Sequence, residues 1–194
     1  TFIQEYFYIY PDHGVFDWSR LDPYMDALHR TGADVVASIT IKPAVLFPEK
    51  DQTIWRPNDA AEWQQVICEL VRRYSVDKKI VTHWEIGNEP DIGEHGGCPY
   101  LIKNAADYLE YYRLTTEAVL KAFPAAKIGG PAIAVHSDPL FFEFIDLCRR
   151  TGTQLDFVSW HLYHDDPARH KQLVLETKER LDRFGPNRPE MLVT

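Results

Sequence analysis

The sequence predicts an α/β fold in which parallel strands alternate with helices around one core. Short runs of β-branched and aromatic residues alternate along the whole chain with longer segments whose apolar residues recur at helical spacing. The chain has 194 residues, of which 45% are hydrophobic and 13% aromatic; this is enough for one packed core and too little for two ordinary domains. Residues 1–194 are therefore expected to form a single domain.

Each expected strand is an apolar run that stops at a proline, a glycine or a polar residue. The first run is closed by Pro11, the second by Pro43 and the third by Pro90. Proline ends a strand because it has no N–H to donate to the ladder. The six expected strands are Phe2–Ile9, Asp34–Ile41, Ile80–Asn88, Lys127–Gly130, Leu155–Leu162 and Met191–Thr194.

Five helices are expected between these strands. The clearest apolar stripe, at spacing i, i+3, i+4 and i+7, runs from Trp63 to Tyr74, and Asn58 is the expected cap behind Pro57. Trp63, like Trp18 before it, is expected to be a core residue on a helix. The other stripes fall near residues 21–28, 108–119, 141–148 and 173–184.

Strict alternation of strand and helix implies right-handed crossovers and a parallel sheet. A doubly wound sheet usually carries a glycine-rich phosphate turn after its first strand. Here that turn is Tyr10–Gly14, which has no GxGxxG pattern and no P-loop. We therefore expect a (β/α)8 TIM barrel, of which six strands lie within this chain.

Composition excludes several kinds of partner. The formal net charge of −8 and the pI of about 5.4 argue against nucleic acid, which selects a basic surface. No apolar run approaches the roughly 18–20 residues of a membrane-spanning helix. The three cysteines, Cys68, Cys98 and Cys148, have neither disulfide-framework nor zinc-site spacing. No metal and no cofactor are expected.

The segment Thr82–Asp91 carries the clearest chemical signal. Glu85, Asn88 and Glu89 lie at or near the end of the third strand, just before Pro90. Active sites of parallel α/β folds form at the carboxyl ends of strands. A carboxylic acid next to an amide at that edge indicates an acid beside a group that binds hydroxyls.

Four motifs in order resemble the clan A glycoside hydrolases, and most closely family 39, which contains β-xylosidases and α-L-iduronidases. The resemblance extends over nearly the whole chain. The motifs are Phe16–Asp22, Trp84–Pro90, Ile128–Ala132 and Asp156–Tyr163.

The resemblance implies roles for individual residues. Glu89 would be the general acid/base at the end of barrel strand four, and Asn88 would bind the sugar 2-hydroxyl. His161 and Tyr163, at the end of strand six, would line the sugar subsite, and Tyr163 would reach the nucleophile. Gly87 departs from the bulkier residue that xylosidases of this family often carry there.

The resemblance also implies that the barrel is incomplete within this chain. The first strand matches the second strand of the family, and the nucleophilic Glu, which follows a Thr at the end of strand seven, is expected just after Thr194. The substrate would be an oligosaccharide or glycoside cleaved with retention, by two carboxyls about 5–5.5 Å apart. Residues 1–194 alone are expected to be inactive.

Other residues leave alternatives open. Glu85 fits a hydrogen-bonded residue of the barrel interior better than a second catalytic group. Trp55 is either a platform for a sugar ring or a hydrophobic plug. Glu5 and Tyr6, expected at the end of the first strand, could reach the sugar.

Two further functions compete with a retaining exo-glycosidase. A non-catalytic carbohydrate-binding barrel would keep the aromatic cleft without a nucleophile. A metal-dependent barrel hydrolase would draw its ligands from His83, Glu85, His161 and His164.

Overall fold

The computed structural model describes residues 1–194, except for the burial of Gly96. Its strands form one parallel sheet in which each strand pairs with the next along the chain. This is the strand order of a barrel wall, and the sheet does not close, so the first and last strands are edges. The strands are β1 (Phe2–Gln4), β2 (Val35–Thr40), β3 (Val81–Ile86), β4 (Lys127–Ile133), β5 (Phe157–Trp160) and β6 (Glu190–Val193).

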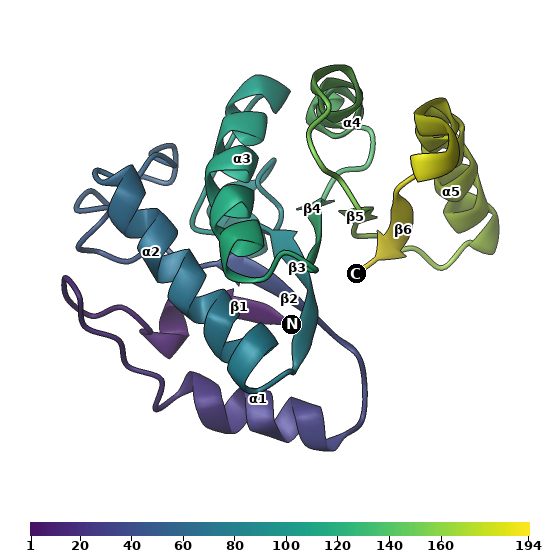
Figure 1. Ribbon diagram of the computed structural model, residues 1–194. Helices are drawn as coiled ribbons and strands as arrows, with labels where there is room; N and C mark the ends of the chain where they lie inside the picture. The colour runs from purple at the N-terminus through teal and green to yellow at the C-terminus, as the bar shows by residue number, and fades with distance from the viewer.

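The helices lie around the outside of the strands as an arc, and both chain ends lie toward the inside of that arc (Figure 1). A π-helical turn, Arg72–Asp77, extends the second helix. None of the described helices is long and apolar enough to cross a membrane. The α-helices are α1 (Leu21–Arg30), α2 (Ala60–Val71), α3 (Ala105–Ala122), α4 (Pro139–Thr151) and α5 (Pro167–Leu181).

The predicted α/β barrel architecture is confirmed, and the first strand is shorter than predicted. β1 pairs with β2 only as far as Gln4, which lies opposite Thr40. The next three residues, Glu5–Phe7, form a 3-10 turn. The backbone N–H of Lys42 donates to the Glu5 carboxylate instead of continuing the ladder. The pairing of β1 with β2 therefore ends where the Glu5 side chain, in place of a backbone carbonyl, accepts the N–H of Lys42.

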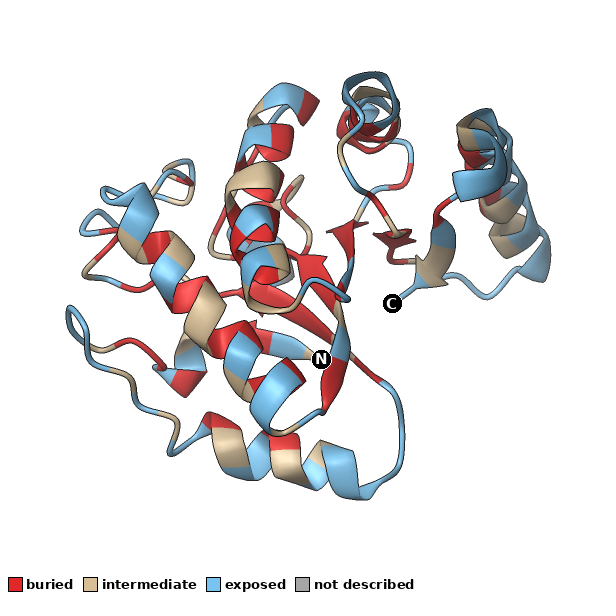
Figure 2. Ribbon diagram, viewed as in Figure 1, coloured by how far each residue is buried: buried red, intermediate tan, exposed pale blue. Residues whose placement is uncertain are grey.

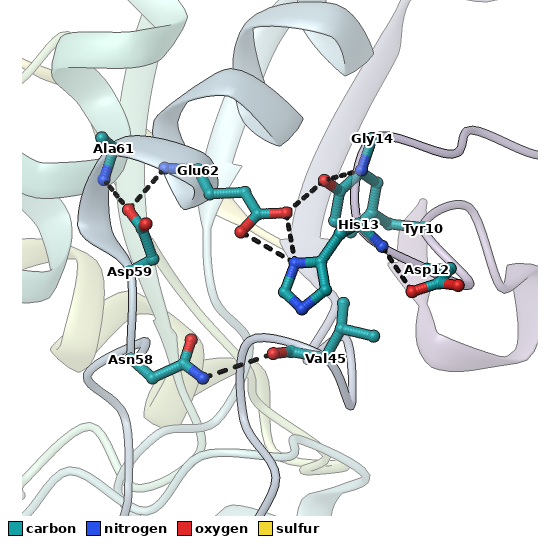
Figure 3. A network of polar contacts seen from close by, with 9 residues as sticks. All are labelled: Tyr10, Asp12, His13, Gly14, Val45, Asn58, Asp59, Ala61 and Glu62. Carbon is teal, nitrogen blue, oxygen red and sulfur yellow. Dashed lines mark hydrogen bonds and ion pairs between the residues drawn. The ribbon is translucent and has the colours of Figure 1, made fainter.

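The expected cap of α2 is displaced by one residue. Asp59, not Asn58, is the N-cap, because its Oδ1 accepts from the N–H groups of Ala61 and Glu62 at 2.9 Å each (Figure 3). The Asn58 side chain instead donates to the Val45 carbonyl oxygen at 3.3 Å. Asp59 therefore caps the helix and Asn58 binds the Val45 carbonyl. The sequence alone does not show which of the two adjacent residues has which role.

A polar cluster fastens the loop after β1 to the first turn of α2. The Glu62 carboxylate accepts from the Tyr10 hydroxyl at 2.5 Å and meets Nδ1 of His13 at 2.7 Å (Figure 3). The Tyr10 oxygen in turn accepts from the Gly14 N–H at 2.6 Å. The hydrogen bond to Glu62 raises the pKa of His13 above its ordinary value.

The core lies between the sheet and the faces of the helices turned toward it (Figure 2). Trp63, Trp84 and Trp160 are fully buried, as expected for the first of them. Trp18 is half-buried and precedes α1, so the expectation that it lies on a helix is wrong. The reason is local: α1 begins only at Leu21, after the turn at Ser19 and Arg20.

Gly129 in β4 allows the close approach of its neighbour β5. A Cβ at this position would lie 2.2 Å from the Phe157 carbonyl oxygen and 2.5 Å from the Phe157 ring. Only glycine fits here without moving backbone. The first of the paired glycines in the Ile128–Ala132 motif therefore has a packing role next to the strand ends.

Candidate active site

The polypeptide turns sharply where β3 ends. Gly87 has a φ of +85° and Glu89 a φ of +47°, both in the left-handed region. Glycine adopts this conformation readily, whereas a glutamate at such a φ is uncommon and costs of order 1–3 kcal/mol unless its surroundings hold it. The holding contact is the Glu89 N–H, which donates to the Ala132 carbonyl oxygen at 2.9 Å.

Ala132 is itself a bulge at the end of β4. The register of β4 and β5 shifts between Pro131 and Ile133, and Ala132 has a φ of +53°. Its N–H donates to the Ser159 hydroxyl oxygen at 2.9 Å. Bulges change the direction of groups at strand ends. This bulge directs the Ala132 carbonyl oxygen toward the backbone N–H of Glu89.

The Glu89 side chain pairs with His161, which follows β5. The Glu89 Oε1 and the His161 Nδ1 are 2.6 Å apart, and the two side chains are 13% and 5% exposed. The His161 N–H donates to the Ile133 carbonyl oxygen at 2.9 Å, which fixes the backbone that carries the ring. His161 Nε2 is buried without a partner among the described residues. A carboxyl and an imidazole from strand ends 72 residues apart thus share one short hydrogen bond.

Two further predicted residues flank this pair. Asn88 directly precedes Glu89 and is 4% exposed. Tyr163 is 91% exposed, and its ring centroid lies 6.4 Å from that of His161. The carboxyl edge of the sheet therefore gathers all four of the residues expected there.

Trp55 is not available as a sugar platform. Its ring is 5% exposed, packs edge-on against Tyr111 with centroids 6.5 Å apart, and has the Arg56 guanidinium 4.0 Å from its centroid. The expectation that Trp55 binds substrate is therefore replaced by the alternative, a hydrophobic plug. The reason is that Tyr111 on α3 packs against Trp55, and the residues next to Trp55 in the sequence do not indicate this contact.

Glu85 belongs to the barrel interior, as predicted. It is 1% exposed, and its Oε2 accepts from the Ser38 hydroxyl on the neighbouring strand. Its place on β3 is set by the parallel register that pairs Ser38 with Glu85.

The metal-dependent alternative has no geometric support. The described residues contain no group of three or more His, Cys, Asp or Glu side chains that could hold a metal ion. His83 lies near the start of β3, where its ring faces Phe157 at 6.0 Å. His161 lies beyond the far end of the sheet's strands, so the two histidines do not meet.

Asp91 is a residue of the site that the sequence reasoning missed. Its two carboxylate oxygens accept from the N–H groups of Ala134 and Val135, at 3.1 and 2.9 Å. Burial raises the pKa of Asp91, and these N–H groups lower it. The side chain thus joins the turn at Glu89 to the loop after β4. Its place directly after Asn88-Glu89-Pro90 was the only local signal.

Comparison with known proteins points to one family. A β-xylosidase of Geobacillus stearothermophilus is 30% identical over 157 residues, which are 72% of this chain and 30% of that protein. The α-L-iduronidase of Homo sapiens is 26% identical over 165 residues, 75% of this chain and 24% of that protein. The chain thus spans about 30% of the length of the first curated relatives it matches.

Solved structures share the fold. A glucosidase from Croceicoccus marinus superposes with a TM-score of 0.75 at 25% identity, over 94% of this chain and 38% of that one. A monomeric β-xylosidase from Caulobacter crescentus CB15 gives a TM-score of 0.76 at 20% identity, over 98% of this chain and 43% of that one. The model of glycosyl hydrolases family 39 matches residues 9–186. Since that match covers most of the 194 residues and contains the Glu89–His161 pair, the chain belongs to glycosyl hydrolase family 39.

Proposed function

We propose that the chain is part of a retaining glycoside hydrolase that cleaves β-glycosidic, xyloside-like bonds with Glu89 as the general acid/base. The observation that carries this proposal is the nearly buried Glu89 carboxyl at the carboxyl edge of the sheet, 2.6 Å from the His161 imidazole. Membership of family 39 and the similarity to proteins named β-xylosidase support the bond class.

In the first step, Glu89 donates its proton to the glycosidic oxygen as the bond to the anomeric carbon breaks. A carboxylate nucleophile attacks that carbon and forms a glycosyl-enzyme. In the second step, Glu89 takes a proton from a water molecule whose oxygen attacks the anomeric carbon. The bond from that carbon to the nucleophile carboxylate breaks, and the sugar is released. His161 restricts the orientation of the Glu89 carboxyl through the hydrogen bond between Nδ1 and Oε1.

We place the nucleophile at the carboxyl end of β6, in the residue that follows Thr194. The Thr194 N–H donates to the Trp160 carbonyl oxygen at 3.1 Å, directly before His161. β6 therefore ends alongside the end of β5, the strand that His161 follows. Two carboxyls about 5–5.5 Å apart on this edge suit a retaining mechanism.

The neighbouring side chains bind the sugar in this proposal. Asn88 hydrogen-bonds the 2-hydroxyl, and His161 and Tyr163 line the subsite. The exposed Tyr163 ring offers a flat face next to His161.

The test is the Glu89→Gln variant of the hydrolase, assayed on two β-xylosides. Turnover of the substrate with a poor leaving group should fall far more than turnover of an activated aryl xyloside, because only the former needs proton donation. Azide should partly restore turnover of the activated substrate. Glu143→Gln, an exposed change on α4, is the matched control and should leave both rates unchanged.

Equal losses on both substrates in Glu89→Gln would remove Glu89 from the acid/base role. Absence of any turnover by the unaltered protein, with sugar binding intact, would favour the non-catalytic carbohydrate-binding barrel. Hydrolysis by residues 1–194 alone would show that the nucleophile lies within them and that its placement after Thr194 is wrong.

A further inference from the structure

A short stretch of backbone at the end of β4, Ala132–Val135, contacts both members of the Glu89–His161 pair. The Ala132 carbonyl oxygen accepts from the Glu89 N–H at 2.9 Å. The Ile133 carbonyl oxygen accepts from the His161 N–H, also at 2.9 Å. We call this stretch the β4 end segment. It supports the backbone on which each of the two side chains stands.

Asp91 attaches the turn after Glu89 to the same segment. Its Oδ1 accepts from the Ala134 N–H at 3.1 Å, and its Oδ2 accepts from the Val135 N–H at 2.9 Å. Each carboxylate oxygen thus takes one of two consecutive backbone N–H groups. Hydrogen bonds to a charged acceptor are stronger than those to a neutral one. The turn is therefore bound to the β4 end segment on both sides of Glu89.

The Glu89 backbone adopts a conformation that its own sequence does not favour. Its φ of +47° lies in the left-handed region, where a Cβ crowds the backbone. The following Pro90 biases the residue before it toward extended conformations. The Glu89 carbonyl oxygen accepts from the N–H groups of Ile92 and Gly93, at 3.2 and 2.9 Å. These two bonds close the turn, whereas the contacts with the β4 end segment hold it against the sheet.

The loss of the Asp91 carboxylate would leave the turn held by the β4 end segment on one side of Glu89. The Glu89 backbone can then relax out of the left-handed region. Its carboxyl would move relative to the His161 Nδ1, which it meets at 2.6 Å. A proton donor must lie within hydrogen-bond reach of the atom it serves, and a misplacement of about 1 Å can cost on the order of 100-fold in rate.

We propose that Asp91 is a positioning residue for proton transfer by Glu89. It acts through the backbone, by holding the turn that aims the Glu89 carboxyl, and it does not itself exchange a proton with the substrate. This inference rests on the proposed function, because it assigns Asp91 to the acid/base role of Glu89.

The first test is the leaving-group dependence of kcat/KM in the hydrolase that contains this chain. Asp91→Ala should lower kcat/KM by about tenfold or more for a β-xyloside with a poor leaving group. It should lower kcat/KM by less than about threefold for an activated aryl xyloside, because only the former needs the proton from Glu89. Asp91→Asn, whose single amide oxygen can accept one of the two N–H groups, should fall between these results. A purely structural defect would lower both values by the same factor.

Asp59→Ala is the matched control. Asp59 also accepts from two consecutive N–H groups, those of Ala61 and Glu62, but at the start of α2. Its loss removes a helix cap and should leave the ratio of the two kcat/KM values unchanged. In the Glu89→Gln background, Asp91→Ala should lose little further on the poor leaving group, since the donor that it positions is gone.

Hydrogen exchange provides a second readout that needs no turnover. The Glu89 amide should exchange faster in Asp91→Ala than in the unaltered hydrolase, and at the unaltered rate in Asp59→Ala. Equal loss of kcat/KM on both substrates, unaltered exchange at Glu89, or a full loss from Asp91→Ala in the Glu89→Gln background would each overturn the proposal. Each result can occur while Glu89→Gln alone still shows its leaving-group dependence, so the proposed function would stand. Failure of the proposed function would appear in Glu89→Gln itself and would overturn both.

Discussion

At the residue scale, the candidate site depends on two residues held in the left-handed backbone region. Glu89 and Ala132 have φ values of +47° and +53°, and one hydrogen bond of 2.9 Å joins the N–H of the first to the carbonyl of the second. Non-glycine residues in this region cluster at functional sites, where surrounding structure determines them. Here the arrangement turns the Glu89 side chain out of the strand direction and toward His161.

Asn88→Ala tests the role of the residue beside the acid. We expect kcat/KM to fall by up to several kcal/mol of transition-state stabilisation, because the contact to the 2-hydroxyl strengthens as the oxocarbenium character develops. A 2-deoxy substrate, which already lacks that hydroxyl, should lose little further in the variant. Steady-state kinetics on both substrates with both proteins gives the comparison. If the 2-deoxy penalty is as large in Asn88→Ala as in the unaltered protein, Asn88 does not bind that hydroxyl.

At the scale of elements, the contact between α4 and α5 contains a buried histidine. His136 is 5% exposed, its Nε2 lies 2.8 Å from the Thr177 hydroxyl, and aromatic rings surround it. Those rings are Phe141, Phe142 and Trp160, with centroids 5.2, 5.2 and 5.6 Å away. Burial lowers the pKa of His136, Glu176 opposes that shift, and Arg169 adds to it. His136 is therefore neutral in the folded chain under conditions where it would be protonated in the unfolded chain.

This difference predicts a loss of stability in mild acid. Below the unfolded pKa of about 6.5 the unfolded chain binds a proton at His136 that the folded chain does not, so the free energy of unfolding falls as pH decreases toward the folded pKa. One such proton contributes a slope of at most about 1.4 kcal/mol per pH unit. Urea unfolding of the unaltered chain and of His136→Phe, at pH 8 and pH 5.5, measures it.

Comparing the pH dependence of unfolding in the unaltered chain and in His136→Phe isolates the contribution of His136. Other groups have pKa shifts with the opposite effect on stability. Burial raises the pKa of Glu5 and Asp91, so these carboxyls favour the folded state as pH falls. They contribute equally to both proteins and cancel in the difference. An unfolding free energy that depends on pH equally in both proteins would contradict the assignment to His136.

At the scale of the whole molecule, the sheet follows the order of a barrel wall but leaves two edges. β1 and β6 each pair on one side only. Phe2 and Val193 on these strands are 40% and 52% exposed. An unpaired strand edge with apolar side chains is a template for pairing with another chain.

Residues 1–194 are therefore predicted to self-associate through these edges. The weight-average mass from sedimentation should rise with concentration, and a Phe2→Lys, Val193→Lys double variant should reduce the rise, because a charge on an edge strand opposes edge-to-edge pairing. Leu175→Lys provides the control, since Leu175 is 53% exposed but lies on the helix α5 and not on an edge strand. A mass that does not change with concentration, or that responds equally to the control, would refute this mode of association.

Local sequence patterns are enough to predict the alternation of strands and helices and the position of the candidate acid. These features are local: apolar periodicity identifies each element, and Asn88 and Glu89 lie between the end of β3 at Ile86 and Pro90. Family motifs added the expectation that His161 and Tyr163 lie at the same edge. The errors concern the ends of elements: the first strand, expected to reach Ile9, ends at Gln4, and the cap of α2 is Asp59 and not the adjacent Asn58.

Which side chains meet depends on contacts between elements that are distant in the sequence. The Glu89–His161 contact joins residues 72 positions apart, and no local pattern specifies its 2.6 Å distance. Trp55 is equally aromatic as a platform or as a plug, and the packing of Tyr111 and Arg56 against its ring decides for the plug. Glu5 depends on the end of β2 for its partner. Periodicity reports which face of an element is buried, whereas register and crossover geometry determine what lies against that face.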